Sequence, residues 1–129
     1  MASSDDWRTA GWCFNRGVMP SVLIDAENVR RSTRPNLSPA DLLERCRSWG
    51  ERENVRVIVV FDGAPPAMDA NDVEGADGSS TDDRIVALAG TLDGSIWLVT
   101  SDRELRDRMR RHADRVIGGG TFVRQSLHG

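Results

Sequence analysis

Residues 55–62 read VRVIVVFD, a nearly continuous run of apolar, mostly β-branched side chains that ends at an aspartate. Such a run is typical of a strand that is covered on both faces, as the strands of parallel sheets are. Two further apolar runs end in the same way. Residues 22–24 (VLI) are followed by Asp25, and residues 96–100 (IWLVT) are followed by Ser101 and Asp102. The sequence therefore predicts a sheet in which three strands end at acidic residues.

The segment between the first two of these strands predicts a loop and then a helix. Residues 26–37 are rich in arginine and end in a Pro-Asn pair, so we expect a loop there. Ser38 can cap a helix and Pro39 suits its first position. Apolar residues then recur at helical spacing, and Gly50 is expected to end the helix.

Two more helices are predicted, each opened by a capping pair. In such a pair, a serine side chain and an acidic side chain three residues later satisfy the free N–H groups of the first turn. Ser80 and Asp83 form the first pair, and Ser101 and Glu104 form the second. Each pair is followed by apolar residues at helical spacing, which predicts an amphipathic helix after each pair.

The remaining segments predict turns and short strands. Residues 63–80 are rich in Gly, Pro, Asp and Ser and predict a long loop, with a short strand at Val73 left open. Val116 and Ile117 predict a fourth strand, followed by a glycine turn and a last strand over residues 121–124. Strands that alternate with helices predict an α/β fold with parallel pairing and right-handed crossovers.

Length and composition predict one domain in a reducing compartment. The chain has 129 residues, of which residues 1–20 predict an irregular N-terminal extension and residues 21–129 the folded domain. Cys13 and Cys46 have neither a metal-binding nor a redox spacing. The sequence predicts neither a signal peptide nor a membrane span, and we expect a cytoplasmic protein.

The charge balance excludes some kinds of chemistry. The formal net charge is −3, so no general basic field indicates a nucleic-acid partner. All 17 basic residues are arginine, which excludes the lysine of a P-loop and any lysine Schiff base. Local arginines could still meet phosphates. Three of them lie just beyond the first strand end, where a phosphate would enter: Arg30, Arg31 and Arg34.

Acidic residues are expected to gather at one edge of the sheet. Asp25, Asp62 and Asp102 follow strands whose carboxyl ends meet at that edge, where the ligands of such sheets bind. Asp82 opens the helix between two of these strands and should reach the same place. Carboxylates at such close range repel one another unless a divalent cation neutralises them, and hard oxygen ligands favour Mg²⁺ or Mn²⁺.

Each of these residues also has a structural explanation. Asp25 and Asp62 could begin turns, and acidic residues favour the first turn of a helix, which could account for Asp102. Ser101 is more often a helix cap than a nucleophile. Of the adjacent pair at the second helix, Asp83 suits the cap and Asp82 the pocket. Turns and caps need no common edge, however, so the joint pattern favours one shared site.

Four segments together resemble the NYN group of the PIN-like nuclease superfamily, in particular its YacP-like branch. They are VLIDAENV (22–29), VVFDG (59–63), STDDRIVAL (80–88) and LVTSDREL (98–105). The resemblance extends from about Ser21 to Arg124. It implies a three-layer α/β/α sandwich with a central, mainly parallel sheet, and metal-dependent cleavage of RNA.

The resemblance also implies roles for individual residues. The acidic metal-site positions fall on Asp25, Asp62, Asp82 and Asp102. Asn28 falls on the asparagine shortly after the first aspartate, Ser101 on a small polar position, and Asp83 on a second acidic position of the helix. Glu27 stands where the family commonly has a tyrosine, and it could add a ligand or point to solvent. The chain also ends soon after its last strand, where relatives tend to continue into a further helix.

The leading hypothesis is a ribonuclease that uses Mg²⁺ or Mn²⁺ and cleaves RNA endonucleolytically at the acidic pocket. The alternative is a non-catalytic NYN-fold module that binds RNA or a protein. A receiver-like phosphoryl-transfer domain ranks last, because such domains generally use a lysine that this chain lacks. The sequence leaves open whether the substrate is RNA or DNA. It also leaves open whether the chain acts alone, as a homodimer or in a larger RNA-processing complex.

Overall fold

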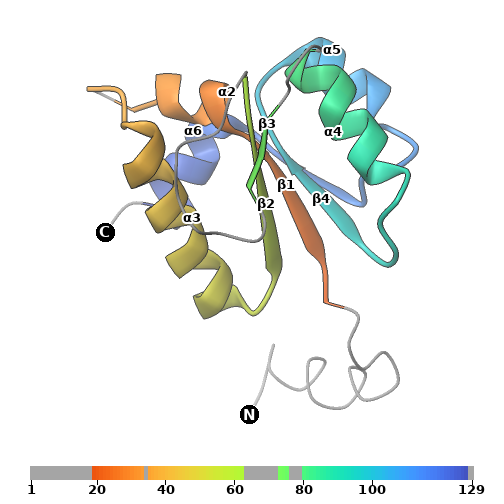
Figure 1. Ribbon diagram of the computed structural model, residues 1–129, viewed down its shortest axis with the longest axis horizontal. Coiled ribbons are helices and arrows are strands. Elements are labelled where there is room, and N and C mark those ends of the chain that lie inside the picture. Colours follow the sequence, from red (N-terminus) through yellow and green to blue (C-terminus); the bar gives the residue numbers. More distant parts are fainter. Residues whose placement is uncertain (1–18, 34, 63–72, 76–79, 128–129) are drawn as a thin grey trace.

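Five parallel strands form one sheet, in the order β3-β2-β1-β4-β5 (Figure 1). The structure is a computed structural model that describes residues 19–33, 35–62, 73–75 and 80–127. Apart from residues 19 and 20, the predicted N-terminal extension lies outside these residues. The strands are β1 (Ser21–Asp25), β2 (Arg56–Phe61), β3 (Val73–Gly75), β4 (Ile96–Val99) and β5 (Arg115–Ile117).

Every pair of neighbouring strands is parallel, as the sequence predicts. The central strand, β1, lies between β2 and β4, with Asp25 paired to Val60 on one side and Ile24 to Val99 on the other. The carboxyl ends of these three strands therefore lie at one edge of the sheet. The short strand left open at Val73 is present as β3 on the outer side of β2.

Helices cover both faces of the sheet and complete three layers, which confirms the predicted α/β/α sandwich. In Figure 1, α2, α3 and α6 lie on one side of the sheet, and α4 and α5 lie on the other. Their bounds are α2 (Ala26–Arg31), α3 (Pro39–Glu53), α4 (Thr81–Ala89), α5 (Arg103–Arg108) and α6 (Gly119–Phe122), which continues into the π-helical turn η2 (Val123–Leu127). None of the helices in the described ranges is both long and apolar enough to cross a membrane.

Two apolar cores, one on each face of the sheet, explain why the central strands β1, β2 and β4 are mostly apolar. Along β1, Val22 and Ile24 face the core under α2, α3 and α6, whereas Leu23 faces the core under α4 and α5. A ring contact closes the first core: Trp49 of α3 and Phe122 of α6 meet edge to face, with ring centroids 4.9 Å apart. Alternate strand residues thus pack in different layers, and a polar side chain on either face would be buried at a cost in free energy unless it found a hydrogen-bond partner.

Two expectations about the segment between β1 and β2 are wrong. Residues 26–37 are not all loop, because α2 begins directly after β1 and buries Ala26 and Val29. The next helix does not stop at Gly50 but continues to Glu53 and ends at Asn54, whose φ of 59° is left-handed. Gly50 is needed for close approach to β2 instead, since a Cβ there would lie 2.6 Å from Val57 Cγ2.

The capping predictions are partly confirmed. The hydroxyls of Ser38 and Ser80 accept hydrogen bonds from the third residue beyond each of them, as capping requires. The predicted Ser101–Glu104 pair is wrong, because Asp102 caps α5 and accepts the N–H groups of Glu104 and Leu105.

The C-terminal segment is also helical where a strand was predicted. Residues 121–124 belong to α6 and η2, and the Phe122 N–H donates to the Gly118 carbonyl at 2.8 Å. The physical reason is burial: a helical turn directs Phe122 into the core, where its side chain is fully buried.

Candidate functional site

The carboxyl ends of β1, β2 and β4 and the start of α4 surround one open cleft of about 280 Å³. All four predicted aspartates line it, although they come from different elements. The complete lining is Asp25, Glu27, Asn28, Arg31, Asp62, Ser80, Thr81, Asp82 and Asp102. The structure therefore brings together residues that lie up to 77 positions apart in the chain (Asp25 and Asp102).

Asp25 is the most buried of these aspartates, with only 7 % of its surface exposed. Burial raises the pKa of its carboxyl. A hydrogen bond from the Thr100 hydroxyl opposes that rise, and the charges of Asp82 and Asp102 add to it. The Thr100 Oγ1 atom lies 3.0 Å from Asp25 Oδ2. Burial and neighbouring negative charge thus both disfavour the ionised form of Asp25. A cation bound beside the carboxylate would favour the ionised form and offset both effects.

The pKa of Asp82, at the start of α4, is also raised, by burial and in part by the same neighbouring negative charge. Partial burial raises its pKa, the charge of Asp102 raises it further, and Arg108 acts in the opposite direction. Asp82 and Asp25 therefore both sense Asp102, and Asp25 senses Asp82. Three carboxylates from β1, α4 and the β4–α5 turn repel one another across the cleft.

Asp83, although adjacent to Asp82, belongs to a different environment and does not line the cleft. Its Oδ1 atom lies 2.9 Å from Arg108 Nη2 in an ion pair, and its N–H donates a hydrogen bond to the Ser80 hydroxyl at 3.0 Å. The hydrogen bond from Arg108 lowers the pKa of Asp83, whereas the pKa of Asp82 is raised. The structure thus gives the two neighbours opposite electrostatic surroundings.

Asp102 and Asp62 complete the acidic lining in different ways. Asp102 Oδ1 accepts the N–H groups of Glu104 at 2.9 Å and Leu105 at 3.3 Å, which fixes the carboxylate at the start of α5. Asp62 follows β2 at the rim of the cleft and is exposed. Asp102 therefore has a structural role as a cap together with its place in the cleft.

Thr100 is one of the site residues that sequence reasoning missed, as are Ser80 and Thr81 of the cleft lining. The Thr100 side chain is fully buried, and its hydroxyl donates to Asp25 while accepting the Asp102 N–H at 3.1 Å. One hydroxyl therefore joins the ends of β1 and β4. The available signal was a hydroxyl at the end of an otherwise apolar run, directly before the acidic segment.

Asn28 and Ser101 support the cleft from the side of α2. Asn28 Oδ1 accepts the Ser101 N–H at 2.9 Å, and Ser101 Oγ accepts the Gly119 N–H at 2.8 Å. These two bonds hold the turn that carries Asp102 against α2 and the start of α6. Asn28 also lines the cleft.

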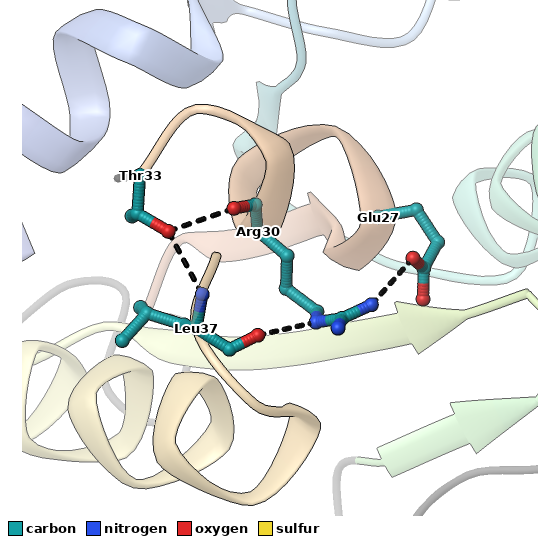
Figure 2. Close-up of polar contacts among 4 residues, drawn as sticks. All are labelled: Glu27, Arg30, Thr33 and Leu37. Carbon is teal, nitrogen blue, oxygen red and sulfur yellow. Dashed lines mark hydrogen bonds and ion pairs between the residues drawn. The ribbon is translucent and has the colours of Figure 1, made fainter. Parts of the chain in front are cut away.

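Of the three arginines predicted to meet phosphates, only Arg31 lines the cleft among the residues described. Figure 2 shows that Arg30 points between Glu27 and Leu37, with Nη1 2.7 Å from Glu27 Oε1 and Nε donating to the Leu37 carbonyl at 2.6 Å. Thr33 strengthens the same loop, because its hydroxyl donates to the Arg30 carbonyl and accepts the Leu37 N–H, both at 2.8 Å. Arg34 lies outside the described residues. Glu27, which could have been a ligand, is paired with Arg30.

The donor set of the cleft suits a hydrated hard cation. Within the described ranges, no three histidine, cysteine, aspartate or glutamate side chains are grouped so that they could hold a metal by themselves. Mg²⁺ rarely needs such a cage, since it usually keeps several waters and uses one or two carboxylates together with substrate phosphates. One or two of the carboxylates of Asp25, Asp82 and Asp102 would suit that kind of binding in atom type and in charge.

Comparison with solved structures identifies the fold. No family model matches the sequence, and no curated protein matches it. The W164L mutant of Rae1 (YacP) from Bacillus subtilis superposes with a TM-score of 0.71 at 20 % identity, over 84 % of this chain and 75 % of that one. A second structure of Rae1 (YacP) gives a TM-score of 0.63 at 21 % identity, over 81 % and 72 % of the two chains. The chain therefore has the fold of Rae1 (YacP), which confirms at the level of the fold the resemblance carried by its acidic segments.

Proposed function

We propose that this protein is a metal-dependent ribonuclease that hydrolyses RNA endonucleolytically in the acidic cleft. The observation that carries the proposal is the meeting of Asp25, Asp82 and Asp102, from three separate elements, in one cleft where the pKa values of Asp25 and Asp82 are raised. Perturbed carboxylates that gather in a cleft are typical of functional sites. The fold shared with Rae1 (YacP) supports this hypothesis, because the acidic segments of the sequence resemble the YacP-like branch of the NYN nucleases.

In this proposal Asp25, Asp82 and Asp102 would hold Mg²⁺ or Mn²⁺ together with waters and substrate phosphates, with one or two carboxylates on each ion and Asp62 close by. The bound ion would supply a water of lowered pKa and offset the charge of the scissile phosphate. An acidic cleft would otherwise repel a phosphate backbone, so the same carboxylates that bind the ion would make RNA binding depend on it.

The surrounding residues position these carboxylates and the substrate. Thr100 directs Asp25 through the hydrogen bond to its Oδ2 atom, and Asn28 holds the turn before Asp102 through Ser101. Arg31 on the cleft wall is suited to contact a flanking phosphate. Arg30 is bonded to Glu27 and to the Leu37 carbonyl, so of the arginines predicted to meet phosphates the proposal uses Arg31.

The direct test is cleavage of a labelled RNA in parallel reactions with EDTA, Mg²⁺ and Mn²⁺, with Asp25→Asn beside the wild type. We expect cleavage only with a metal and a loss of at least about 100-fold in the variant. Cleavage that persists in EDTA, or an Asp25→Asn protein that is folded and cuts like the wild type, would contradict the mechanism. A folded wild type that neither cuts RNA nor gains stability with Mn²⁺ would favour the alternative of a non-catalytic binding module.

A further inference from the structure

Two hydrogen bonds connect the C-terminal glycine run to the acidic cleft. The Gly119 N–H donates to Ser101 Oγ at 2.8 Å, and the Ser101 N–H donates to Asn28 Oδ1 at 2.9 Å. Ser101 directly precedes Asp102, which lines the cleft and caps α5. The start of α6, the β4–α5 turn and α2 are thus linked through one serine.

Gly119 lies so close to Asn28 that no side chain fits there. Gly119 is buried, and a Cβ on it would overlap Asn28 Oδ1 and lie 3.2 Å from Ser32 Oγ and 3.4 Å from Ser101 Oγ. The requirement is for space and not for an unusual backbone, since among the described glycines only Gly94 has a positive φ. Glycine at position 119 therefore lets α6 reach the hydrogen-bonded pair.

The flanking glycines differ from Gly119 and provide matched controls. At Gly118 the nearest atom to an added Cβ would be Ser101 Oγ at 3.6 Å, which is an ordinary contact distance. At Gly120 the nearest atom would be Arg124 Nη1 at 3.3 Å, the end of a long and adaptable side chain. The same chemical change, Gly→Ala, thus overlaps a neighbouring atom at only one of these three positions, and that atom, Asn28 Oδ1, is held by the hydrogen bond from the Ser101 N–H.

The core prevents α6 from retreating to make room. Phe122, three residues after Gly119, is fully buried and packs edge to face on Trp49. A methyl group at position 119 must therefore displace Asn28 or the turn at Ser101. Because Asp102 follows Ser101, such a shift would move a carboxylate of the cleft.

We propose that Gly119 is a positioning residue of the cleft, which sets the place of the Asp102 carboxylate through Ser101 and Asn28. This inference rests on the proposed function for its effect on RNA cleavage. Its structural part, the coupling of Gly119 to the Ser101 N–H, can be measured independently of cleavage.

The test compares Gly119→Ala with Gly118→Ala and Gly120→Ala in metal-dependent RNA cleavage and in amide hydrogen exchange. A misplacement of about 1 Å can reduce a rate about 100-fold, so we expect a loss of that order in kcat for Gly119→Ala, with KM changed less. The other two variants should cleave like the wild type. We also expect faster exchange of the Ser101 amide in Gly119→Ala alone. Equal behaviour of the three variants, or unchanged Ser101 protection in Gly119→Ala, would overturn the proposal.

Two further measurements keep the outcomes distinguishable. If the wild type does not cleave RNA, the proposed function fails, and the exchange of the Ser101 amide still decides the positioning role. If Gly119→Ala does not fold, the double variant Asn28→Ala with Gly119→Ala removes the overlapping atom and should regain stability while staying inactive. A double variant no more stable than Gly119→Ala would show that the contact with Asn28 is not the cause.

Discussion

The most informative single substitution beside the cleft is Thr100→Val, because valine keeps the shape of threonine and replaces only its hydroxyl with a methyl group. That hydroxyl donates to Asp25 Oδ2 at 3.0 Å and accepts the Asp102 N–H at 3.1 Å. A hydrogen bond to a charged group contributes about 1.5–3 kcal/mol, and the side chain is fully buried. We therefore expect Thr100→Val to lower the free energy of unfolding by about 1.5–3 kcal/mol at neutral pH.

The same substitution should change the titration of Asp25. The Thr100 hydrogen bond lowers the pKa of Asp25, so its removal raises that pKa further. The stabilisation from this bond is present when Asp25 is ionised and is lost as pH falls through the pKa of the carboxyl. The stability difference between variant and wild type should therefore shrink in acid, and the acid limb of the pH–rate profile should move to higher pH.

Thr100→Ser is the matched control for this prediction. It keeps both hydrogen bonds and removes one buried methyl group, which costs about 1 kcal/mol of stability. Urea unfolding at neutral and acid pH, followed by pH–rate profiles of RNA cleavage, compares the two variants. The reasoning is refuted if Thr100→Val matches Thr100→Ser in its acid limb and in the pH dependence of its stability.

Two further predictions concern charge in and around the cleft. The pKa values of Asp25 and Asp82 are raised, so the folded state holds protons that the unfolded state releases, and without metal the melting temperature should decline as pH rises through these pKa values. Mn²⁺ should reverse this decline in thermal melts. An equal decline in Asp25→Asn would contradict the prediction. Arg31→Gln should raise KM for RNA in a salt-dependent way, because Arg31 lines the cleft. Arg30→Gln loses its bonds to Glu27 and Leu37, so it should lower the melting temperature with little change in KM. The same KM effect in both variants would argue against the assigned roles.

The sheet and the acidic edge could be predicted from the sequence because their signals are local. A parallel strand that is covered on both faces is apolar over most of its length, so a long apolar run predicts it. Asp25 and Asp62 follow such runs directly. Once pairing is parallel, the convergence of the strand ends follows from topology alone.

The missed features depend on contacts distant in sequence or on context. The short helix α2 follows β1 without a loop, and its arginines are typical of a loop, whereas the burial of Ala26 and Val29 depends on contacts with the rest of the fold. Ser101 and Asp102 are both good caps by residue type. Ser101 is occupied by Asn28 and Gly119, which are 73 and 18 residues away, and this leaves the cap to Asp102.

The C-terminal helix was missed for a related reason. Three consecutive glycines disfavour a helix by propensity, so residues 118–120 predicted a turn. Burial of Phe122 and the close approach of Gly119 to Asn28 outweigh that propensity. Neither contact can be predicted from the local sequence pattern, because both partners are distant in the sequence.

The central claim, that the acidic cleft uses a metal to cut RNA, is tested most directly by comparing Asp82→Asn with Asp83→Asn. The two residues are adjacent on α4, yet Asp82 lines the cleft and Asp83 is paired with Arg108 outside it. We predict that Mn²⁺-dependent RNA cleavage falls at least about 100-fold in Asp82→Asn and stays near the wild-type rate in Asp83→Asn. Equal rates in the two variants, or the greater loss in Asp83→Asn, would contradict the account.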